Sequence, residues 1–224
     1  MGQLLLVRHG QASWGADDYD VLSPLGWEQS RMLGQALSER ALAPTVIIQG
    51  TMRRHRETAE SVATGAGWVD TPVIEDGGWD EFDHLAMLRC HPAPFGDREP
   101  TRAEFQEWFV QASTRWTSGE HDEDYDETFA AFADRVDGAI DRAAARVGSN
   151  ETALVFTSGG PVAWAATSLV AAAGEARTHA FVWNQFNKVV VNSSLTKIVV
   201  SARGETLVSF NEHSHLEGDG LTYR

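Results

Sequence analysis

The amino-acid sequence predicts an α/β protein, a three-layer α/β/α sandwich around a mostly parallel sheet with a cap insertion over the carboxyl edge. Short apolar runs alternate along the chain with longer segments of helical spacing, as in folds whose parallel sheet is covered by helices on both faces. The 224 residues are 42% hydrophobic, enough for one domain with a large core. Because no internal repeat or linker interrupts this pattern, residues 1–224 are expected to form a single domain.

The first part of the chain contains three predicted strands and two predicted helices. Leu4 to Val7 is a continuous apolar run with no basic segment before it, which favours a buried strand over a signal peptide. Ser23 and Pro24 are typical of the N-cap and the first residue of a helix. The expected elements are strands at 4–7 and 45–50, a short strand or extended edge at 72–76, and helices at about 24–42 and 53–66.

A change of composition marks residues 77–127 as the cap insertion. Much of it is rich in Gly, Pro and aromatic residues and is expected to be irregular, but Thr101 and Glu104 form a capping box for a helix to about Trp116. The expected elements that follow are a helix over about 126–147, a buried strand at 152–157, a helix that begins at Pro161, and a hairpin of two β-rich runs across Arg203 and Gly204.

Charge and cysteine content exclude several classes of protein. The net charge of −14 argues against binding to nucleic acid, and the chain has no apolar run long enough to span a membrane. A single cysteine, Cys90, fits a reducing compartment, so a cytoplasmic location is expected. Lys188 and Lys197 are the only lysines, which leaves arginine as the main cation, the side chain suited to bidentate binding of phosphate or carboxylate.

Two basic segments could bind an anion. Arg8 and His9 follow a buried strand, where a charged pair is costly unless it meets a ligand; Arg8 could bind an anion and His9 could be a nucleophile or an acid–base group. The alternative is a histidine satisfied within a turn. "TMRRHRETAE" at 51–60 brings three arginines to a strand–helix junction that favours anions, although a solvated basic face is the usual meaning of such a run.

Two further segments are acidic or glycine-rich. "GWDEFDH" at 78–84 places carboxyl groups among aromatic residues that can raise the pKa of an acid, or it is an ordinary acidic loop. "TSGG" at 157–160 follows a strand and opens a helix, so its amides can bind an anion. Ser158 is not in the Gly-x-Ser-x-Gly setting of a serine hydrolase, because Phe156 stands where the first glycine belongs.

Together these segments resemble the histidine phosphatase superfamily, the phosphoglycerate-mutase-like fold. The similarity rests on five segments that cover essentially the whole chain: "LLLVRHGQAS", "YDVLSPLGWEQSRMLG", "GTMRRHRETAE", "WDEFDH" and "FNEHSHL". The resemblance implies that His9 attacks phosphorus to form a phosphohistidine and that Arg8 and Arg54 neutralise the phosphoryl oxygens. It implies that Glu81 protonates the leaving alcohol and then activates water, with no metal and no organic cofactor.

The resemblance also assigns substrate binding to Gln11, Ser13, Ser158 and Gly159. The family normally has a second catalytic histidine after the strand at 152–157, so the chain resembles a bacterial-type member with Ser158 in its place. Losing a hydrogen bond to a charged group corresponds to roughly tenfold to a hundredfold in rate. Two histidines are candidates to compensate for the loss, His55 and His84.

The resemblance implies a metal-independent phosphomonoester hydrolase with reduced or retuned activity. Its partners would be a small phosphorylated substrate and inorganic phosphate as product, with neither nucleic acid nor membrane and with the oligomeric state open. Two alternatives stay open at this point. Phosphoglycerate-mutase-type phosphoryl transfer is disfavoured. The resemblance implies that a mutase carries a lysine and a pair of arginines in the segment after the acid, and this chain has no lysine before Lys188. A non-catalytic phosphate-ester-binding or regulatory protein would follow if Ser158 abolished turnover.

Overall fold

A single mixed sheet forms the centre of the molecule. The protein is represented by a computed structural model, which describes residues 1–13, 20–96 and 98–223. Within these residues the sheet has six strands in the order β3-β2-β4-β1-β5-β6. Their bounds are β1 Gly2–Arg8, β2 Val46–Gln49, β3 Val73–Glu75, β4 Thr152–Thr157, β5 Leu195–Ser201 and β6 Gly204–Glu212. The predicted strands and the predicted C-terminal hairpin are therefore confirmed.

The pairing of the strands brings the ends of β1 and β4 together. β1 to β4 pair in parallel, whereas β5 and β6 add an antiparallel hairpin along β1. Arg8 lies opposite Thr157 in the parallel register of β1 and β4, and the His9 amide donates to the Thr157 carbonyl oxygen at 2.8 Å. The residues that follow the two strands, His9 and Ser158, therefore leave the sheet at the same edge.

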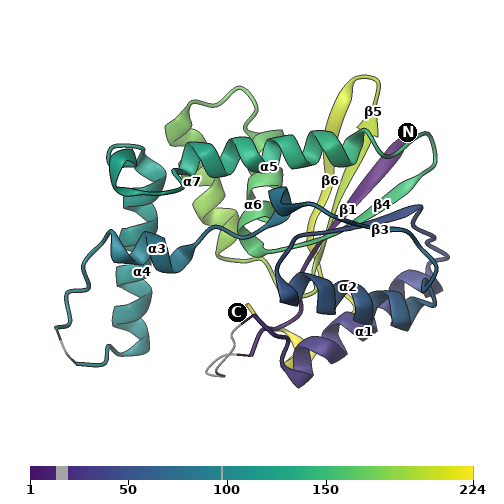
Figure 1. The fold of residues 1–224 in the computed structure, drawn as a ribbon, viewed down its shortest axis with the longest axis horizontal. Helices are drawn as coiled ribbons and strands as arrows, with labels where there is room; N and C mark the ends of the chain where they lie inside the picture. Colours follow the sequence, from purple (N-terminus) through teal and green to yellow (C-terminus); the bar gives the residue numbers. More distant parts are fainter. Residues whose placement is uncertain (14–19, 97, 224) are drawn as a thin grey trace.

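Helices cover both faces of the sheet, which confirms the predicted α/β architecture (Figure 1). α1 (Pro24–Glu39) and α2 (Arg53–Ala66) lie on one face, and α5 (Phe129–Ala144) and α6 (Gly159–Val170) lie on the other. The alternation of side chains along β1 explains how one strand serves two cores. Leu4 and Leu6 pack in the core under α5 and α6, whereas Leu5 and Val7 pack in the core under α1 and α2.

Three helices differ from the sequence-based expectations. The helix after β4 begins at Gly159 and not at Pro161, because proline is tolerated within a first turn whose amides have no intrahelical partner. α3 (His84–Arg89) lies in a stretch that was expected to be irregular, and the Asp83 side chain caps it by accepting from a backbone amide of its first turn at 2.9 Å. α7 (Ala176–Asn187) was not anticipated from the sequence.

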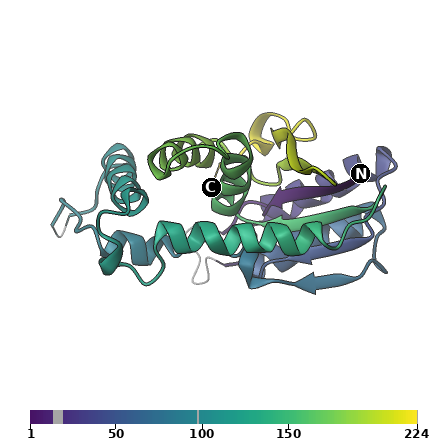
Figure 2. The same cartoon turned by 90° about the horizontal axis from the view of Figure 1, so that it is seen from above.

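The segment 77–127 extends away from the sheet, and its helices lie to one side of the sandwich (Figure 2). It contains α3 and α4 (Arg102–Ser118). The predicted capping box is present, since the Thr101 hydroxyl accepts from the Glu104 amide and the Glu104 carboxylate accepts from the Thr101 amide. The helix expected from this motif is therefore confirmed.

An aromatic cluster packs this segment against the rest of the chain. The rings of Phe82 and Trp116 stack with 4.8 Å between their centroids, and Trp116 also contacts Trp183 of α7. Large aromatic side chains bury much apolar surface, so these contacts fix α4 relative to α7. In the part of the chain that the structure describes, no helix is both long and apolar enough to cross a membrane.

Candidate active site

A cavity of about 1250 Å³ lies between the segment 77–127 and the carboxyl edge of the sheet. Its lining includes residues from the end of β1, the start of α2, the loop before α3 and the start of α6: Arg8, His9, Arg54, Glu81 and Gly159. The apolar part of its lining comes mainly from α3, α4 and the loop between them: Leu85, Leu88, Pro92, Phe105, Trp108, Phe109 and Val110. The four residues expected to be catalytic therefore meet in one place, at the edge where α/β sheets bind ligands.

His9 is held with one ring nitrogen bonded to the backbone. Its Nδ1 atom lies 2.7 Å from the carbonyl oxygen of Gly10, which can only accept, so Nδ1 carries the proton of the neutral ring and Nε2 keeps a lone pair. Burial first, and then Arg54, Arg8 and His55, hold the pKa of His9 well below its ordinary value of 6.5. The imidazole is thus neutral, as a nucleophile must be.

Two arginines supply positive charge around this histidine. Arg54 has a relative exposure of 7% and donates to Asp20 at 2.7 Å. Arg8 donates to the backbone carbonyl oxygens of Val190 and Tyr223. These contacts fix both guanidinium groups before a ligand arrives, so little conformational entropy is lost when an anion binds.

The neighbours of Arg54 in α2 are directed elsewhere. Arg53 pairs with Glu57 at 2.8 Å, and Arg56 pairs with Glu75 at 3.5 Å. Neither Arg53 nor Arg56 is among the described residues that line the cavity. Of the three arginines in "TMRRHRETAE", the structure therefore brings Arg54 to the site and leaves the other two on the surface.

Glu81 is placed against the first turn of α6. Its carboxylate accepts from the Gly160 amide at 3.1 Å. Burial raises the pKa of Glu81 above its ordinary value of 4.5, against the opposing effects of the Gly160 amide, Arg54 and Arg8. A raised pKa lets the carboxyl group keep its proton to higher pH, as a general acid requires.

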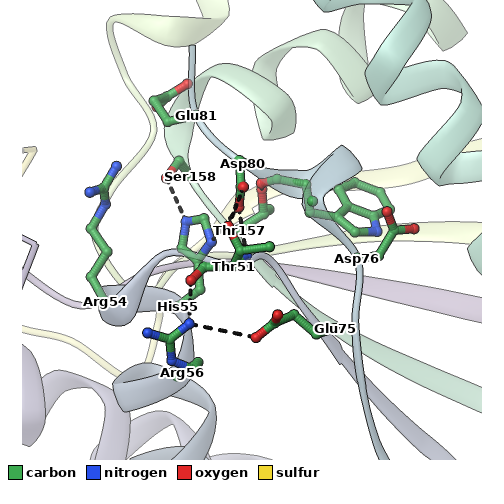
Figure 3. Close-up of polar contacts among 12 residues, drawn as sticks. Thr51, Arg54, His55, Arg56, Glu75, Asp76, Asp80, Glu81, Thr157 and Ser158 are labelled. Atoms are coloured by element: carbon green, nitrogen blue, oxygen red, sulfur yellow. Dashed lines mark hydrogen bonds and ion pairs between the residues drawn. The ribbon is translucent and has the colours of Figure 1, made fainter. Parts of the chain in front are cut away.

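Ser158 is bonded to a histidine from another element (Figure 3). Its hydroxyl oxygen lies 2.7 Å from Nε2 of His55, the third residue of α2, and both side chains are fully buried. The Nδ1 atom of His55 lies 3.7 Å from a carboxylate oxygen of Asp80. Asp80 in turn accepts from the amide and the hydroxyl of Thr51 at 2.6 and 2.5 Å. Sequence reasoning missed Asp80, because nothing in the local pattern distinguishes it from the neighbouring acids.

His55 also lies beside His9, with 5.9 Å between the two ring centroids. His84, the other candidate for compensation, lines the cavity at the start of α3. Burial is the main cause that lowers the pKa of both rings, His55 and His84. The hydrogen bond to Ser158 singles out His55 as the histidine coupled to position 158.

The residues expected to bind substrate are divided between the cavity and its surroundings. Gly159 lines the cavity. Ser158 lies buried behind it, and the side-chain oxygen of Gln11 accepts from the Ser23 hydroxyl at 2.8 Å. Gln11, Ser13 and Ser158 are not among the described residues that line the cavity, so their role in substrate binding stays a prediction.

Comparison with known proteins identifies the family. The model of the histidine phosphatase superfamily (branch 1) matches residues 4–213. A 2,3-bisphosphoglycerate-dependent phosphoglycerate mutase from Thermobifida fusca is 32% identical over 112 residues, which are 47% of this chain and 42% of that protein. A mutase of the same name from Corynebacterium kroppenstedtii is 28% identical over 120 residues, 51% of this chain and 48% of that protein. The chain thus spans about half the length of the curated relatives it matches.

Solved structures share the fold over nearly the whole chain. A phosphoserine phosphatase from Entamoeba histolytica superposes with a TM-score of 0.66 at 21% identity, covering 97% of this chain and 100% of that one. A phosphoglycerate mutase from Bacillus anthracis superposes with a TM-score of 0.67 at 19% identity, covering 95% and 94%. The chain belongs to the histidine phosphatase superfamily, which the sequence motifs had indicated.

Proposed function

We propose that this member of the histidine phosphatase superfamily hydrolyses phosphomonoesters through a phosphohistidine formed on His9, with Glu81 as the proton donor. The observation that carries the proposal is the 2.7 Å contact between Nδ1 of His9 and the Gly10 carbonyl oxygen. The Gly10 carbonyl oxygen holds the ring proton on Nδ1, which leaves the Nε2 lone pair for attack beside two arginines. Phosphoryl transfer depends mainly on such positioning and on neutralisation of charge.

In the first step the Nε2 lone pair of His9 forms a bond to phosphorus while the bond from phosphorus to the ester oxygen breaks. Glu81 gives its proton to the departing alkoxide, so the alcohol leaves neutral and Glu81 becomes a carboxylate. Arg8 and Arg54 stabilise the charge that develops on the phosphoryl oxygens. Both arginines act on the pKa of His9 and of Glu81, which supports a shared location for the four groups.

In the second step a water molecule replaces the alcohol. The Glu81 carboxylate takes a proton from this water as its oxygen bonds to phosphorus and the bond from Nε2 to phosphorus breaks. Inorganic phosphate leaves, and both His9 and Glu81 return to their starting protonation states. Glu81 supplies the proton that the departing alcohol takes, and the water molecule restores that proton to Glu81.

The walls of the cavity favour a leaving group with an apolar part. The cavity is lined by several aliphatic and aromatic side chains of α3 and α4, among them Leu88, Phe105 and Phe109. Burial of apolar surface is worth roughly 25 cal/mol per Å². An aryl or alkyl phosphate would therefore gain affinity from these contacts that a small sugar phosphate would not.

The test is hydrolysis of an aryl phosphate by the purified chain without added metal, in the native form and in His9→Ala. We expect turnover in the native chain and its loss in His9→Ala, together with a trapped phosphoenzyme that is labile in acid and stable in base. His179→Ala is the matched control, because His179 bonds to the Ala171 carbonyl oxygen and is not among the described residues that line the cavity. Turnover that survives His9→Ala would contradict the mechanism. Binding without turnover would support the non-catalytic alternative.

Mutase-type transfer is the second candidate, because the curated relatives named above are phosphoglycerate mutases. It would require the phosphoryl group on His9 to pass to a hydroxyl group of a phosphoglycerate and not to water. Cations that could hold its carboxylate line the cavity at Arg89, Arg102 and Lys188. Interconversion of 2- and 3-phosphoglycerate, with and without bisphosphoglycerate, separates this activity from hydrolysis.

A further inference from the structure

A chain of three polar side chains lies next to His9, and two of them, His55 and Ser158, are fully buried. It runs from Asp80 through His55 to Ser158, with 3.7 Å between Asp80 and Nδ1 of His55 and 2.7 Å between Nε2 and the Ser158 hydroxyl (Figure 3). His55 comes from α2, whereas Ser158 ends the turn between β4 and α6. The three residues therefore link two elements that contribute to the phosphoryl site.

The backbone makes room for this chain at Gly50. A Cβ atom on Gly50 would lie 2.3 Å from Nδ1 of His55 and 2.6 Å from the nearer Asp80 oxygen. Any other residue at this position would thus push the imidazole and the carboxylate apart. The absence of a side chain at Gly50 is what allows Nδ1 to face Asp80.

The buried imidazole is costly as a purely structural link. His55 has no exposed surface, and its Nδ1 atom is buried without a hydrogen-bond partner, since Asp80 lies beyond hydrogen-bond distance. A buried polar atom that is left unsatisfied lowers the free energy of unfolding. An apolar side chain would avoid the cost at Nδ1 but would remove the hydrogen bond to the buried Ser158 hydroxyl, so the arrangement points to a role for the ring at Ser158.

We propose that His55 is a positioning residue of the phosphoryl site, which takes up a proton when a phosphoryl dianion binds and turns the Ser158 hydroxyl into a donor toward a phosphoryl oxygen. This inference rests on the proposed function and names a further group that serves the same site. It places the second imidazole of the site on α2, behind Ser158, and not at the end of β4.

The proton balance follows from which atom donates in the hydrogen bond between His55 and Ser158, before and after an anion binds. Before an anion binds, Nδ1 carries the ring proton toward Asp80, and Nε2 accepts from the Ser158 hydroxyl. When the dianion arrives, one proton from solvent adds to Nε2, which then donates to the Ser158 oxygen, and the hydroxyl proton turns to the phosphoryl oxygen. The imidazolium lies between the Asp80 carboxylate and the new negative charge, so both of its N–H groups face favourable partners.

The charges around the ring agree with this change of state. The groups that face His55 are Arg54 and Arg56 of α2, His9 after β1, and Asp80 in the loop before α3. Burial and the two arginines keep the ring neutral before an anion binds. A bound dianion offsets the arginines and favours the protonated ring.

Ser158 itself is not the nucleophile of a hydrolase triad, although a histidine and an aspartate stand behind it. Both Ser158 and His55 have no exposed surface, whereas His9 retains 4% and lines the cavity. The cavity therefore opens onto His9, and in the proposed step the Ser158 hydroxyl meets only a phosphoryl group already bound there. The closed surroundings strengthen that contact, because little water competes for it.

The experiment measures binding of tungstate, a dianion that does not itself titrate near neutral pH, by calorimetry in two buffers that differ in their heat of ionisation. Native protein is compared with His55→Gln and Ser158→Ala, with the double variant, and with His179→Gln as the control. Tungstate binding does not depend on turnover, so a chain that fails to hydrolyse esters still reports on His55.

We expect native protein to take up roughly one more proton per tungstate than His55→Gln and to bind it roughly tenfold to a hundredfold more tightly. Ser158→Ala should weaken binding by a similar factor, the double variant should be no weaker than either single one, and His179→Gln should match native protein. Equal proton uptake and equal affinity in native protein and His55→Gln would overturn the inference, and so would additive losses in the double variant. If His55→Gln does not fold, His55→Asn takes its place under the same criteria.

Discussion

The Glu81 carboxylate occupies the space that a side chain at position 160 would need. A Cβ atom on Gly160 would lie 2.1 Å from Oε1 of Glu81, while the Gly160 amide donates to Oε2 at 3.1 Å. Glycine at this position thus leaves room for the acid that its backbone amide binds. The position of the proposed proton donor is set by the helix that follows β4.

Gly160→Ala should therefore displace Glu81 and lower kcat by roughly tenfold to a hundredfold, part of the contribution that a general acid makes. The measurement is steady-state hydrolysis of an alkyl phosphate, whose poor leaving group needs the proton. Gly77→Ala is the control, because its new Cβ atom would meet the Thr51 methyl group at an ordinary 3.5 Å. A Gly160→Ala enzyme with native kcat would show that Glu81 does not act from this position.

The pH dependence of kcat/KM should be bell-shaped. The attacking form needs neutral His9, whose pKa lies well below 6.5, and protonated Glu81, whose pKa lies above 4.5. Activity should therefore fall at low pH as His9 gains a proton and at high pH as Glu81 loses one. Glu81→Gln should retain the acid limb and lose the alkaline limb, although at a lower rate. If activity still falls at high pH in Glu81→Gln, the alkaline limb comes from the titration of a group other than Glu81.

Stability should fall as the pH drops below the ordinary histidine pKa of 6.5. In the unfolded chain His55 gains a proton below that pH, whereas burial keeps it neutral in the folded protein. The unfolded state then binds more protons, so the free energy of unfolding decreases with a slope that corresponds to at most one proton for this residue. The slope ends once the pH passes below the lowered pKa of the folded state.

Urea unfolding of native protein and His55→Gln across this pH range tests that expectation. The other groups with shifted pKa values are common to both proteins, including Glu81, whose raised pKa acts in the opposite direction. The difference between the two slopes therefore reports on His55, together with its minor effect on the pKa of His9. Parallel curves would mean that His55 is protonated equally in the folded and unfolded states.

Ser158→His should destabilise the native chain and should do so much less in a His55→Ala background. The Ser158 hydroxyl lies 2.7 Å from the His55 ring and has no exposed surface, so a second ring cannot fit beside the first. Overpacking of this kind costs roughly 1–3 kcal/mol. Chemical denaturation of the native chain, the two single variants and the double variant measures how much less Ser158→His lowers the free energy of unfolding when His55 is absent. Equal destabilisation in both backgrounds would mean that the two side chains do not compete for one space.

The apolar wall should favour longer alkyl phosphates. Each methylene buried in the cavity is worth about 0.8 kcal/mol, or roughly a fourfold gain in kcat/KM per carbon until the wall is covered. A series from ethyl to octyl phosphate measures this gain, and Phe109→Ala should flatten it, since Phe109 lines the cavity. A flat series in native protein would place the leaving group outside this part of the cavity.

Local signals in the sequence predicted most of the fold, and the resemblance to the family predicted the four groups that meet at the cavity. Apolar runs and caps act over a few residues, so the strands, the capping box at Thr101 and the helix that begins at Pro24 could be predicted. The rule that ligands bind where parallel strands end then brought His9 and Arg54 to one edge. α7 could not be predicted in this way, because Trp183 is its main buried residue and its N-cap side chain makes no capping hydrogen bond.

What only the tertiary structure decided is which side chains meet across long distances in the chain. Ser158 and His55 are 103 positions apart, and Glu81 and Gly160 are 79 apart. No periodicity or cap encodes such pairs. Ser158 and His55 meet because β2 and β4 lie side by side and bring the elements that follow them together, and Glu81, after β3, meets the helix that follows β4. The sequence alone determined that position 158 is a serine, where the family resemblance leads one to expect a histidine. Packing decided that the imidazole of His55, from α2, lies within hydrogen-bond distance of this serine.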